Sequence, residues 1–231
     1  MRLVQFVALC GISSRRKAVA IIKNGEIQVN TTQCLDPAYI VQETDVIYYQ
    51  SKQLSIPESY VYLALNKPKN VISASSSPHG EITVIDLVKN KFPTQRLYPI
   101  GRLDKDSTGL IILTNDGHFA QKIAHPAFEI TKKYRVKITK KLSKTDHKLL
   151  ISGVTLEDGF SQFDELQQIA PKTYEVSLHS GKNRIIRRMF AYLGHEVIEL
   201  HRISIGSLSL KNLALGNFKH LSPEEISNLT N

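Results

Sequence analysis

The 231-residue sequence predicts an α+β protein with a small N-terminal domain and a larger domain, whose mixed, mainly antiparallel sheet has flanking helices. Three observations lead to this prediction. Residues 2–50 combine two short helical patterns with a strand pattern, and residues 53–59 are polar and contain a proline. The remaining residues mix strands and helices without regular βαβ alternation. We therefore expect one domain at 1–52, a linker at 53–59 and a second domain at 60–231.

The small domain begins with a helical pattern that Gly11 can end. A second helix follows, with Ser13 as its expected N-cap and Gly25 after it. A short alternating strand is expected at 26–30. The apolar residues at helical spacing are Leu3, Phe6, Val7 and Cys10 in the first helix, and Val19, Ile21 and Ile22 in the second.

Three cations occupy the first turn of the second helix: Arg15, Arg16 and Lys17. Cations at this end oppose the helix dipole, which is unfavourable unless an anion docks nearby. These residues are therefore candidate contacts to a polyanionic partner, although the same pattern also fits a solvated basic surface.

The larger domain contains strands of clear alternation. A strand is expected at 60–65, and 132–138 places Tyr134, Val136 and Ile138 on one face with basic residues on the other. Residues 174–178 repeat this pattern. A helix is expected after Gly181-Lys182-Asn183, with Gly194 ending it. A capping box with proline at the first helical position, at 222–225, predicts a last helix.

Composition narrows the class of function. The net charge of +9 and a pI near 9.5 favour a polyanionic partner. Two cysteines are too few for disulfides to stabilise a domain of this size. The histidines are scattered and do not have the spacing of zinc ligands, so no metal is expected. The N-terminal residues lack the pattern of a secretory signal peptide, and no apolar stretch is long enough to span a membrane. We expect a cytoplasmic protein that contacts no membrane.

The most informative segment is Gly101-Arg102-Leu103-Asp104-Lys105-Asp106-Ser107-Thr108-Gly109-Leu110, which runs into an apolar strand pattern. Asp104 is expected on a glycine-bounded loop at the strand entrance, where a rigid scaffold can hold one carboxylate in a cleft. Asp106, two residues away, reads as structural.

The small domain resembles the αL RNA-binding module of a ribosomal small-subunit protein and of several RNA-modifying enzymes. The residues that carry this resemblance are Phe6, Gly11, Ser14-Arg15-Arg16-Lys17-Ala18, Ile22, Gly25 and Val29-Asn30.

The segment around Asp104 closely resembles the catalytic motif of pseudouridine synthases, which isomerise uridine in RNA. Lys132-Lys133-Tyr134-Arg135-Val136 resembles the family motif whose tyrosine lies against the target uracil. The run 181–190 is similar to that of the Rsu-type branch and aligns the active-site arginine with Arg187, which would keep Asp104 ionised. By the same resemblance, the contacts to RNA phosphates would include Arg102, Arg184 and Arg188.

The resemblance extends from Leu65-Asn66-Lys67-Pro68 to Leu200-His201-Arg202-Ile203-Ser204-Ile205-Gly206. The sequence departs from the family pattern at two positions. Asn70 occupies a position where glycine is common, and asparagine tolerates the left-handed conformation better than most residues. Lys182 stands where arginine is common.

The resemblance implies isomerisation without a cofactor. The uridine is flipped into a pocket, its glycosidic bond is cleaved, and the uracil rotates and rejoins the ribose through carbon 5. Asp104 would act either as a nucleophile on the sugar or as a base at the 2′ position, and Tyr134 would stack on the base.

The leading hypothesis is a ribosomal RNA pseudouridine synthase, expected to be a monomer, whose partners are ribosomal RNA or ribosomal assembly intermediates. Residues 67–73 and 83–87 favour the small-subunit (16S) enzyme, whereas 183–188 also suits large-subunit relatives. The alternative is a non-catalytic RNA-binding factor in ribosome assembly on the same scaffold. A metal-free hydrolase that uses Asp104 has no partnered base in its favour.

Overall fold

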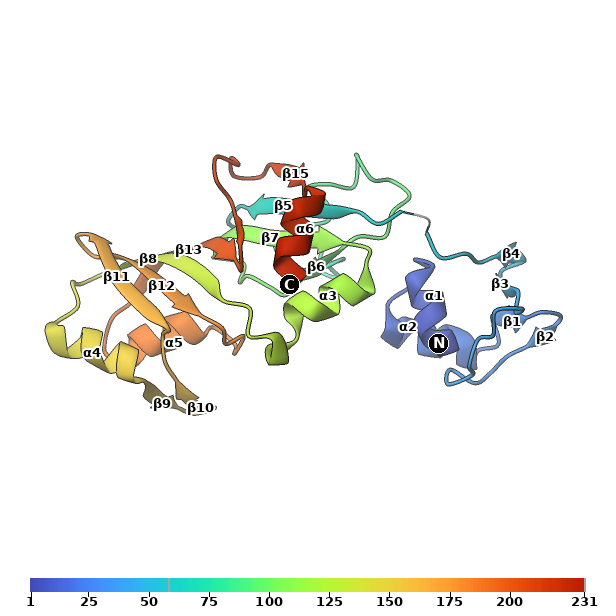
Figure 1. Cartoon of the computed structure of the whole chain (residues 1–231), viewed down its shortest axis with the longest axis horizontal. Helices are drawn as coiled ribbons and strands as arrows, with labels where there is room; N and C mark the ends of the chain where they lie inside the picture. The colour runs from blue at the N-terminus through green and yellow to red at the C-terminus, as the bar shows by residue number, and fades with distance from the viewer. Residues whose placement is uncertain (58, 231) are drawn as a thin grey trace. The chain divides into compact units, whose positions relative to one another are not determined.

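The computed structural model describes residues 1–57 and 59–230, and the chain divides into two compact units (Figure 1). The small unit comprises Met1–Val61 with two short segments, Pro93–Leu97 and Asn115–Gly117. The rest of the described chain forms the large unit. Position 58, within the expected linker, lies outside the described residues.

The small unit has two helices and a four-stranded antiparallel sheet in the order β2-β1-β3-β4. Leu3 and Val7 of the first helix and Ile22 of the second are fully buried, as the helical spacing predicts. The elements are α1 (Leu3–Leu9), α2 (Arg15–Lys23), β1 (Ile27–Val29), β2 (Thr32–Gln33), β3 (Ile47–Tyr49) and β4 (Lys52–Gln53).

Two details of the small unit differ from the prediction. Ser14 rather than Ser13 caps α2, because its hydroxyl accepts a hydrogen bond from the backbone N–H of Lys17 at 3.3 Å. Leu54, expected in the linker, belongs to the core of the small unit, and its N–H donates to the carbonyl of Ile47 at 2.8 Å. A polar surrounding sequence concealed this one buried side chain.

The large unit is built on one long sheet with strand order β11-β12-β8-β13-β7-β5-β15, with β6 paired to β7 and β14 to β13. Its elements are β5 (Tyr62–Lys67), β6 (Tyr98–Ile100), β7 (Thr108–Thr114), α3 (Gly117–Ala124), the 3₁₀ helix η1 (Pro126–Phe128), β8 (Lys132–Ile138), α4 (Lys144–Ser152), β9 (Val154–Leu156), β10 (Gly159–Ser161), β11 (Glu165–Ala170), β12 (Thr173–Leu178), α5 (Ile185–Tyr192), β13 (Val197–Ile205), β14 (Leu208–Ser209), β15 (Phe218–His220) and α6 (Pro223–Thr230).

Most of these strands pair antiparallel, and the α+β class with a mainly antiparallel sheet is confirmed. The exception is the junction between β13 and β7, which pairs parallel at only two positions, His201 with Thr108 and Arg202 with Gly109. Gly109 has φ of +112°, and a Cβ there would lie 2.3 Å from the carbonyl oxygen of Arg202. Glycine is therefore required at this position for β7 to approach β13.

Two hydrophobic cores lie along this sheet. One packs α4 and α5 against β8, β11, β12 and β13, and includes Tyr134, Tyr174 and Phe190. The other packs α3 and α6 near β5, β7 and β14. Figure 1 shows α4 and α5 beside β11 and β12, and α3 and α6 beside β5 and β7. The β13–β7 junction therefore lies where one core gives way to the other.

Several local predictions for the large unit are confirmed. Tyr134, Val136 and Ile138 are buried on one face of β8. Asn70 adopts the left-handed conformation with φ of 66°. Ser222 and Glu225 form the capping box of α6, at 3.0 and 3.1 Å. The apolar face of α5 is buried as expected, through Ile185, Ile186, Met189 and Phe190.

Candidate active site

A cleft of about 690 Å³ lies in the large unit. It is lined by the loop before β7, the end of α3 with η1, the strands β8 and β13, and the loop before α5. Apolar lining residues come from both cores, among them Leu103 and Ile186 from one and Ile123 and Ile205 from the other. A cleft of this volume is in the range of small-molecule sites, and its walls belong to two separately packed halves.

Asp104 lines this cleft, on the loop between β6 and β7, with its side chain 18% exposed. Ser73 holds the loop from the preceding segment: its hydroxyl donates to the carbonyl of Leu103 at 2.8 Å and accepts from the N–H of Leu103 at 3.0 Å. The N–H of Ser107 donates to the carbonyl of Asp104 at 3.0 Å. The carboxylate therefore stands on a loop fixed on both sides.

The cation nearest to this carboxylate is Arg184, whose Nη1 lies 3.5 Å from Oδ2 of Asp104. Arg184 immediately precedes α5 and has left-handed backbone angles, with φ of 48°. Arg184 also approaches Asp106, with both nitrogen–oxygen distances at 3.4 Å. Asp104 thus shares one guanidinium with its neighbour two residues away.

Arg187, which the motif alignment assigns to the active site beside Asp104, forms no ion pair with Asp104 among the described contacts and lies against the same loop two to three residues further on. Its guanidinium pairs with Asp106 at 3.0 Å and donates to the carbonyl of Val197 at 2.8 Å and the hydroxyl of Ser107 at 3.4 Å. The difference arises because Arg187 projects from the first turn of α5 toward the start of β7, whereas the left-handed turn directs Arg184 toward the carboxylate. Asp106, expected to be structural only, bridges the two arginines.

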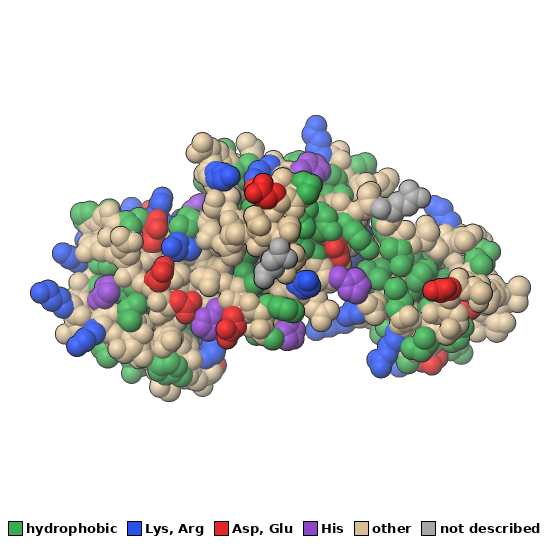
Figure 2. Space-filling model, viewed as in Figure 1, with side chains coloured by type: hydrophobic (Ala, Val, Ile, Leu, Met, Phe, Trp, Pro, Cys, Tyr) green, Lys and Arg blue, Asp and Glu red, His purple; other side chains and the backbone are tan. Residues whose placement is uncertain are grey.

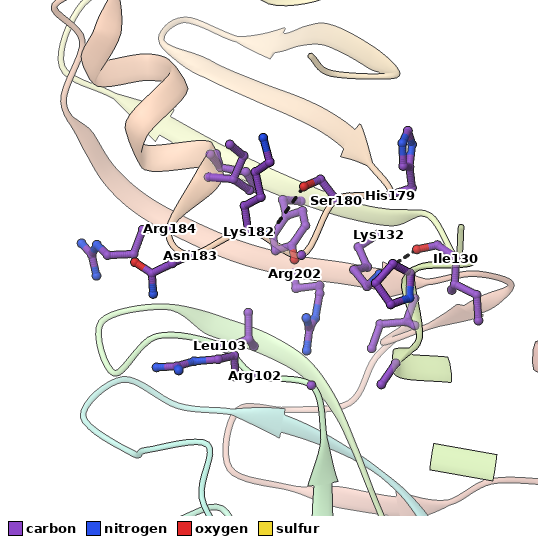
Figure 3. Close-up of a pocket in the computed structure, with 18 of the residues that line it drawn as sticks. Arg102, Leu103, Ile130, Lys132, His179, Ser180, Lys182, Asn183, Arg184 and Arg202 are labelled. Atoms are coloured by element: carbon purple, nitrogen blue, oxygen red, sulfur yellow. Dashed lines mark hydrogen bonds between the residues drawn. The ribbon is translucent and has the colours of Figure 1, made fainter. Parts of the chain in front are cut away.

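Tyr134 lines the same cleft as Asp104, from β8. Its ring is 9% exposed, and the guanidinium carbon of Arg202 lies 6.0 Å from the ring centroid. Arg202 is the register partner of Tyr134 on β13, so the two side chains share a face of the sheet. Figure 3 shows Arg202 directed into the cleft, between the loop that carries Leu103 and the strands.

Sequence reasoning did not single out Arg202 or Lys132, which both line the cleft. Arg202 is 3% exposed; its Nε donates to the carbonyl of Leu110 at 2.7 Å, while its Nη2 is buried with no hydrogen-bond partner. Lys132 donates to the carbonyl of Ile130 at 2.8 Å. Burial, and then the charge of Arg202, lower the pKa of Lys132. The signal that could have found Arg202 is an arginine two positions after Leu200, hence on the inward face of a strand.

Lys67 is a second buried cation near the site, at the end of β5. Its ammonium donates to the carbonyls of Pro68 at 3.0 Å and Val71 at 2.6 Å, which closes the turn that follows. Burial lowers the pKa of Lys67 to about 8, against the opposing effects of Asp106 and Asp104. Lys67 therefore feels the negative charge of both aspartates.

The basic residues expected to contact RNA phosphates lie in different parts of the structure. Arg102 is exposed on the rim of the cleft. Arg188 does not line the cleft as described, and forms a two-pronged ion pair with Asp158, with both distances at 2.8 Å. Arg15, Arg16 and Lys17 are exposed in the first turn of α2 in the small unit. Arg15 and Arg16 line a shallow groove there with Arg2 and Gln5.

Basic side chains are otherwise scattered over the visible face of both units, so charge alone does not mark a site (Figure 2). Among the residues that the structure describes, no group of His, Cys, Asp or Glu side chains is arranged to hold a metal ion. None of the helices in the described part of the chain has the length and apolar character needed to cross a bilayer.

Comparison with known proteins places this geometry in a family. A family model for RNA pseudouridylate synthases matches residues 61–192, and the S4 domain model matches residues 1–47. A crystal structure of pseudouridylate synthase superposes with a TM-score of 0.73 at 26% identity, over 99% of both chains.

Named relatives agree with these matches. The chain is 39% identical to ribosomal large subunit pseudouridine synthase B of Bacillus subtilis over 99% of this chain and 95% of the relative. It is 32% identical to the dual-specificity RNA pseudouridine synthase RluF of Salmonella typhi, over 99% of this chain and 78% of the relative. Neither name supports the small-subunit preference expected from residues 67–73 and 83–87.

The large-unit fold, the cleft that contains Asp104 and these matches lead to one conclusion. The chain belongs to the RNA pseudouridylate synthase family, in its Rsu-type branch with an N-terminal S4 domain, and is a pseudouridine synthase that acts on RNA.

Proposed function

We propose that this enzyme isomerises a uridine of large-subunit (23S) ribosomal RNA, with Asp104 as the reactive group. The observation that carries the chemical part is Asp104 itself, a carboxylate held on a fixed loop in the same cleft as Tyr134. The choice of subunit is supported by the large-subunit synthase of Bacillus subtilis, which is 39% identical along almost the whole chain. This target replaces the small-subunit preference.

Asp104 acts at the sugar. The carboxylate either attacks carbon 1′ of the flipped uridine, or removes the proton at the 2′ position so that the base departs. In both routes the bond between carbon 1′ and N1 breaks, and its electron pair leaves with the uracil. Arg184, 3.5 Å from the carboxylate, holds Asp104 toward the cleft in either route.

Tyr134 holds the base. Its ring lies on the inward face of β8 and lines the cleft, so a uracil that leaves its RNA stack can lie against it. The apolar lining that includes Leu103 and Ile130 excludes water while the base is detached, and a detached base in open water would be lost.

The remaining RNA contacts come from basic side chains outside the base pocket. Arg102 at the cleft rim and Arg184 are suited to phosphates, although Arg184 also contacts Asp104. In the small unit, Arg15, Arg16 and Lys17 are exposed at the N-terminal end of α2, where backbone N–H groups also point toward an anion. The proposed partner is ribosomal RNA or an assembly intermediate that contains it.

The test compares the two ribosomal RNAs directly. Deproteinised 23S and 16S rRNA from cells lacking this protein are incubated with the full-length chain, and pseudouridines are mapped in each. We expect one new pseudouridine in 23S rRNA and none in 16S rRNA, with Asp104→Asn as the inactive control. Modification confined to 16S rRNA would contradict the proposed target, and normal turnover by the Asp104→Asn variant would contradict the proposed role of Asp104.

A further inference from the structure

The cleft contains a buried cation that lacks an anionic partner. Arg202 is 3% exposed and lines the cleft, yet its Nη2 has no hydrogen-bond partner. No carboxylate of the described residues forms an ion pair with it, in contrast to Arg184, Arg187 and Arg188. A buried charged group without its full set of partners is costly, so such a group in a binding cleft points to a ligand acceptor.

Lys132 adds a second positive charge at the same place. It lines the cleft on β8, two residues before Tyr134, and donates only to a backbone carbonyl, that of Ile130, among the contacts described. Burial, and then the charge of Arg202, lower the pKa of Lys132, and both cations line the same cleft. This wall of the cleft therefore carries positive charge that the protein does not compensate.

The position of Arg202 relative to Tyr134 suggests which ligand atoms would accept a hydrogen bond from its guanidinium. The guanidinium carbon lies 6.0 Å from the ring centroid, at the outer limit of a cation–π contact, so the guanidinium is not stacked directly on the ring. A uracil lying on the ring at contact distance would turn an edge toward the guanidinium. The hydrogen-bond acceptors on the edges of uracil are its carbonyl oxygens O2 and O4.

Negative charge develops on those oxygens during the reaction. When the bond between carbon 1′ and N1 breaks, its electron pair stays with the uracil as an anion, whose charge is shared between N1, O2 and O4. This holds whether Asp104 bonds to carbon 1′ or takes the 2′ proton. Carbon 5 then bonds to carbon 1′ with an electron pair of the same anion, while the bond from Asp104 to carbon 1′ breaks in the first route or Asp104 returns the 2′ proton in the second. The carbon-5 proton is lost and N1 takes up a proton, which restores the ring.

We propose that Arg202, with Lys132 beside it, hydrogen-bonds a carbonyl oxygen of the stacked uracil and stabilises the uracil anion formed when the glycosidic bond breaks. The proposal rests on the isomerase function above and assigns a further catalytic residue to it. A donor aimed at a position where charge develops lowers the barrier to the reaction more than it strengthens binding of the neutral substrate.

The Arg202 side chain is held in place by the protein before substrate binds. Its Nε is held by the carbonyl of Leu110 at 2.7 Å, and its backbone closely approaches Gly109 across the β13–β7 junction. The guanidinium is thus oriented before substrate arrives, which is what electrostatic stabilisation of a transient charge requires.

A phosphate of the RNA is the competing ligand. A phosphodiester carries its full charge before the reaction begins, so an arginine that binds it contributes to affinity and to salt dependence rather than to the chemical step. The low exposure of Arg202 and its place beside the base-stacking ring favour the uracil. The two assignments predict opposite kinetic effects.

The experiment measures single-turnover rates and RNA affinity for full-length variants, on whichever ribosomal RNA transcript the wild-type protein modifies. For Arg202→Gln we expect the rate at saturating enzyme to fall on the order of 10²-fold or more, with RNA affinity within about twofold of wild type. Arg202→Lys, which keeps the charge, should recover part of the rate. Lys132→Gln should lower the rate by about tenfold. The matched control is Lys137→Gln on the exposed face of the same strand, with no change in rate.

Several outcomes would overturn the proposal. One is weaker RNA binding with an unchanged rate at saturation, which would assign Arg202 to a phosphate; another is no change in either quantity. Thermal unfolding is measured for each variant, and if Arg202→Gln does not fold, Lys132→Gln decides by the same rate-against-affinity comparison. If the wild-type protein modifies 16S instead of 23S rRNA, only the proposed target fails, and this test runs unchanged on 16S rRNA.

Discussion

The two walls of the cleft differ in how their charges are balanced. On one wall, Asp104 lies near Arg184, and Asp106 and Arg187 stand directly behind this pair without lining the cleft; every one of these four groups has an ion-pair partner. On the other wall, Arg202 and Lys132 both line the cleft, and no ion pair is formed by either among the described residues. The ion pairs on the first wall hold Asp104 in place in the free protein, whereas we propose that the charges on the second wall are balanced only when substrate binds.

The difference implies two kinds of mutational effect. Substitutions on the paired wall disturb an existing network, so they change both the reactive group and the local packing. Substitutions on the unpaired wall remove a group whose partner is absent from the free protein, so their effect appears mainly in the reaction. The predictions below test this contrast further, in order of expected size.

The largest effect is expected within the paired wall, between its two carboxylates. Asp104→Asn should lower single-turnover pseudouridine formation by at least about 10³-fold with RNA affinity retained, because an amide can act neither as nucleophile nor as base. Asp106→Asn should lower it by only about tenfold, because Asp106 positions arginines and does not react. Equal losses in the two variants would contradict the separate roles of Asp104 and Asp106.

A smaller effect distinguishes the two arginines. Arg184→Gln should lower the single-turnover rate by about tenfold, because Arg184 approaches Asp104. Arg187→Gln should instead lower the free energy of unfolding by about 1–3 kcal/mol, because the Arg187 side chain is 13% exposed and bonds the carbonyl of Val197. Denaturant unfolding and single-turnover kinetics are measured for both variants. A large rate loss for Arg187→Gln at unchanged stability would instead support the assignment made by motif alignment.

Lys67 should make stability depend on pH in the alkaline range. Its folded-state pKa of about 8 lies below the ordinary value of 10.5, so between these pH values the unfolded chain binds more protons than the folded one. Its contribution to the free energy of unfolding therefore rises with pH from about 8 to about 10.5, by at most about 3 kcal/mol. Unfolding measured against pH should show this rise in wild type and not in Lys67→Met. An identical rise in both proteins would assign it to other groups.

The smallest effect is expected in the small unit. The double variant Arg15→Gln with Arg16→Gln should weaken RNA affinity several-fold and reduce the slope of log affinity against log salt by about 2, without changing the rate at saturation. Lys23→Gln, in the last turn of the same helix, is the matched control. An unchanged salt slope would mean that the first turn of α2 is a solvated surface.

Much of the fold was predictable because local patterns decide it. The alternation in β8 predicts the burial of Tyr134, Val136 and Ile138, and the apolar spacing in α5 predicts its buried face. The ends of helices and domains were less predictable, because single contacts decide where each one lies. Ser14 rather than Ser13 caps α2, and Leu54 joins the core of the small unit despite its polar neighbours.

For the site, the sequence identified the residues that lie in motifs. It missed the residues whose importance comes from contacts with distant segments of the chain. Asp104 and Tyr134 line one cleft, as the motifs lead one to expect. Ser73, which bonds both backbone groups of Leu103 from thirty positions away, has no local signal. Arg202 carries only the weak signal of a charged residue on an inward strand face, and nothing local shows that its Nη2 is unpartnered.

The sequence by itself determined the α+β class, the pseudouridine synthase motifs and the position of the Asp104 carboxylate on a loop, because each of these depends on residues close together in the chain. Only the tertiary structure decided that Arg184 rather than Arg187 approaches Asp104, and that Arg202 lies beside Tyr134 without an anion. Ion pairing depends on where distant segments meet, and here the left-handed turn before α5 and the close approach of β7 to β13 at Gly109 decide it.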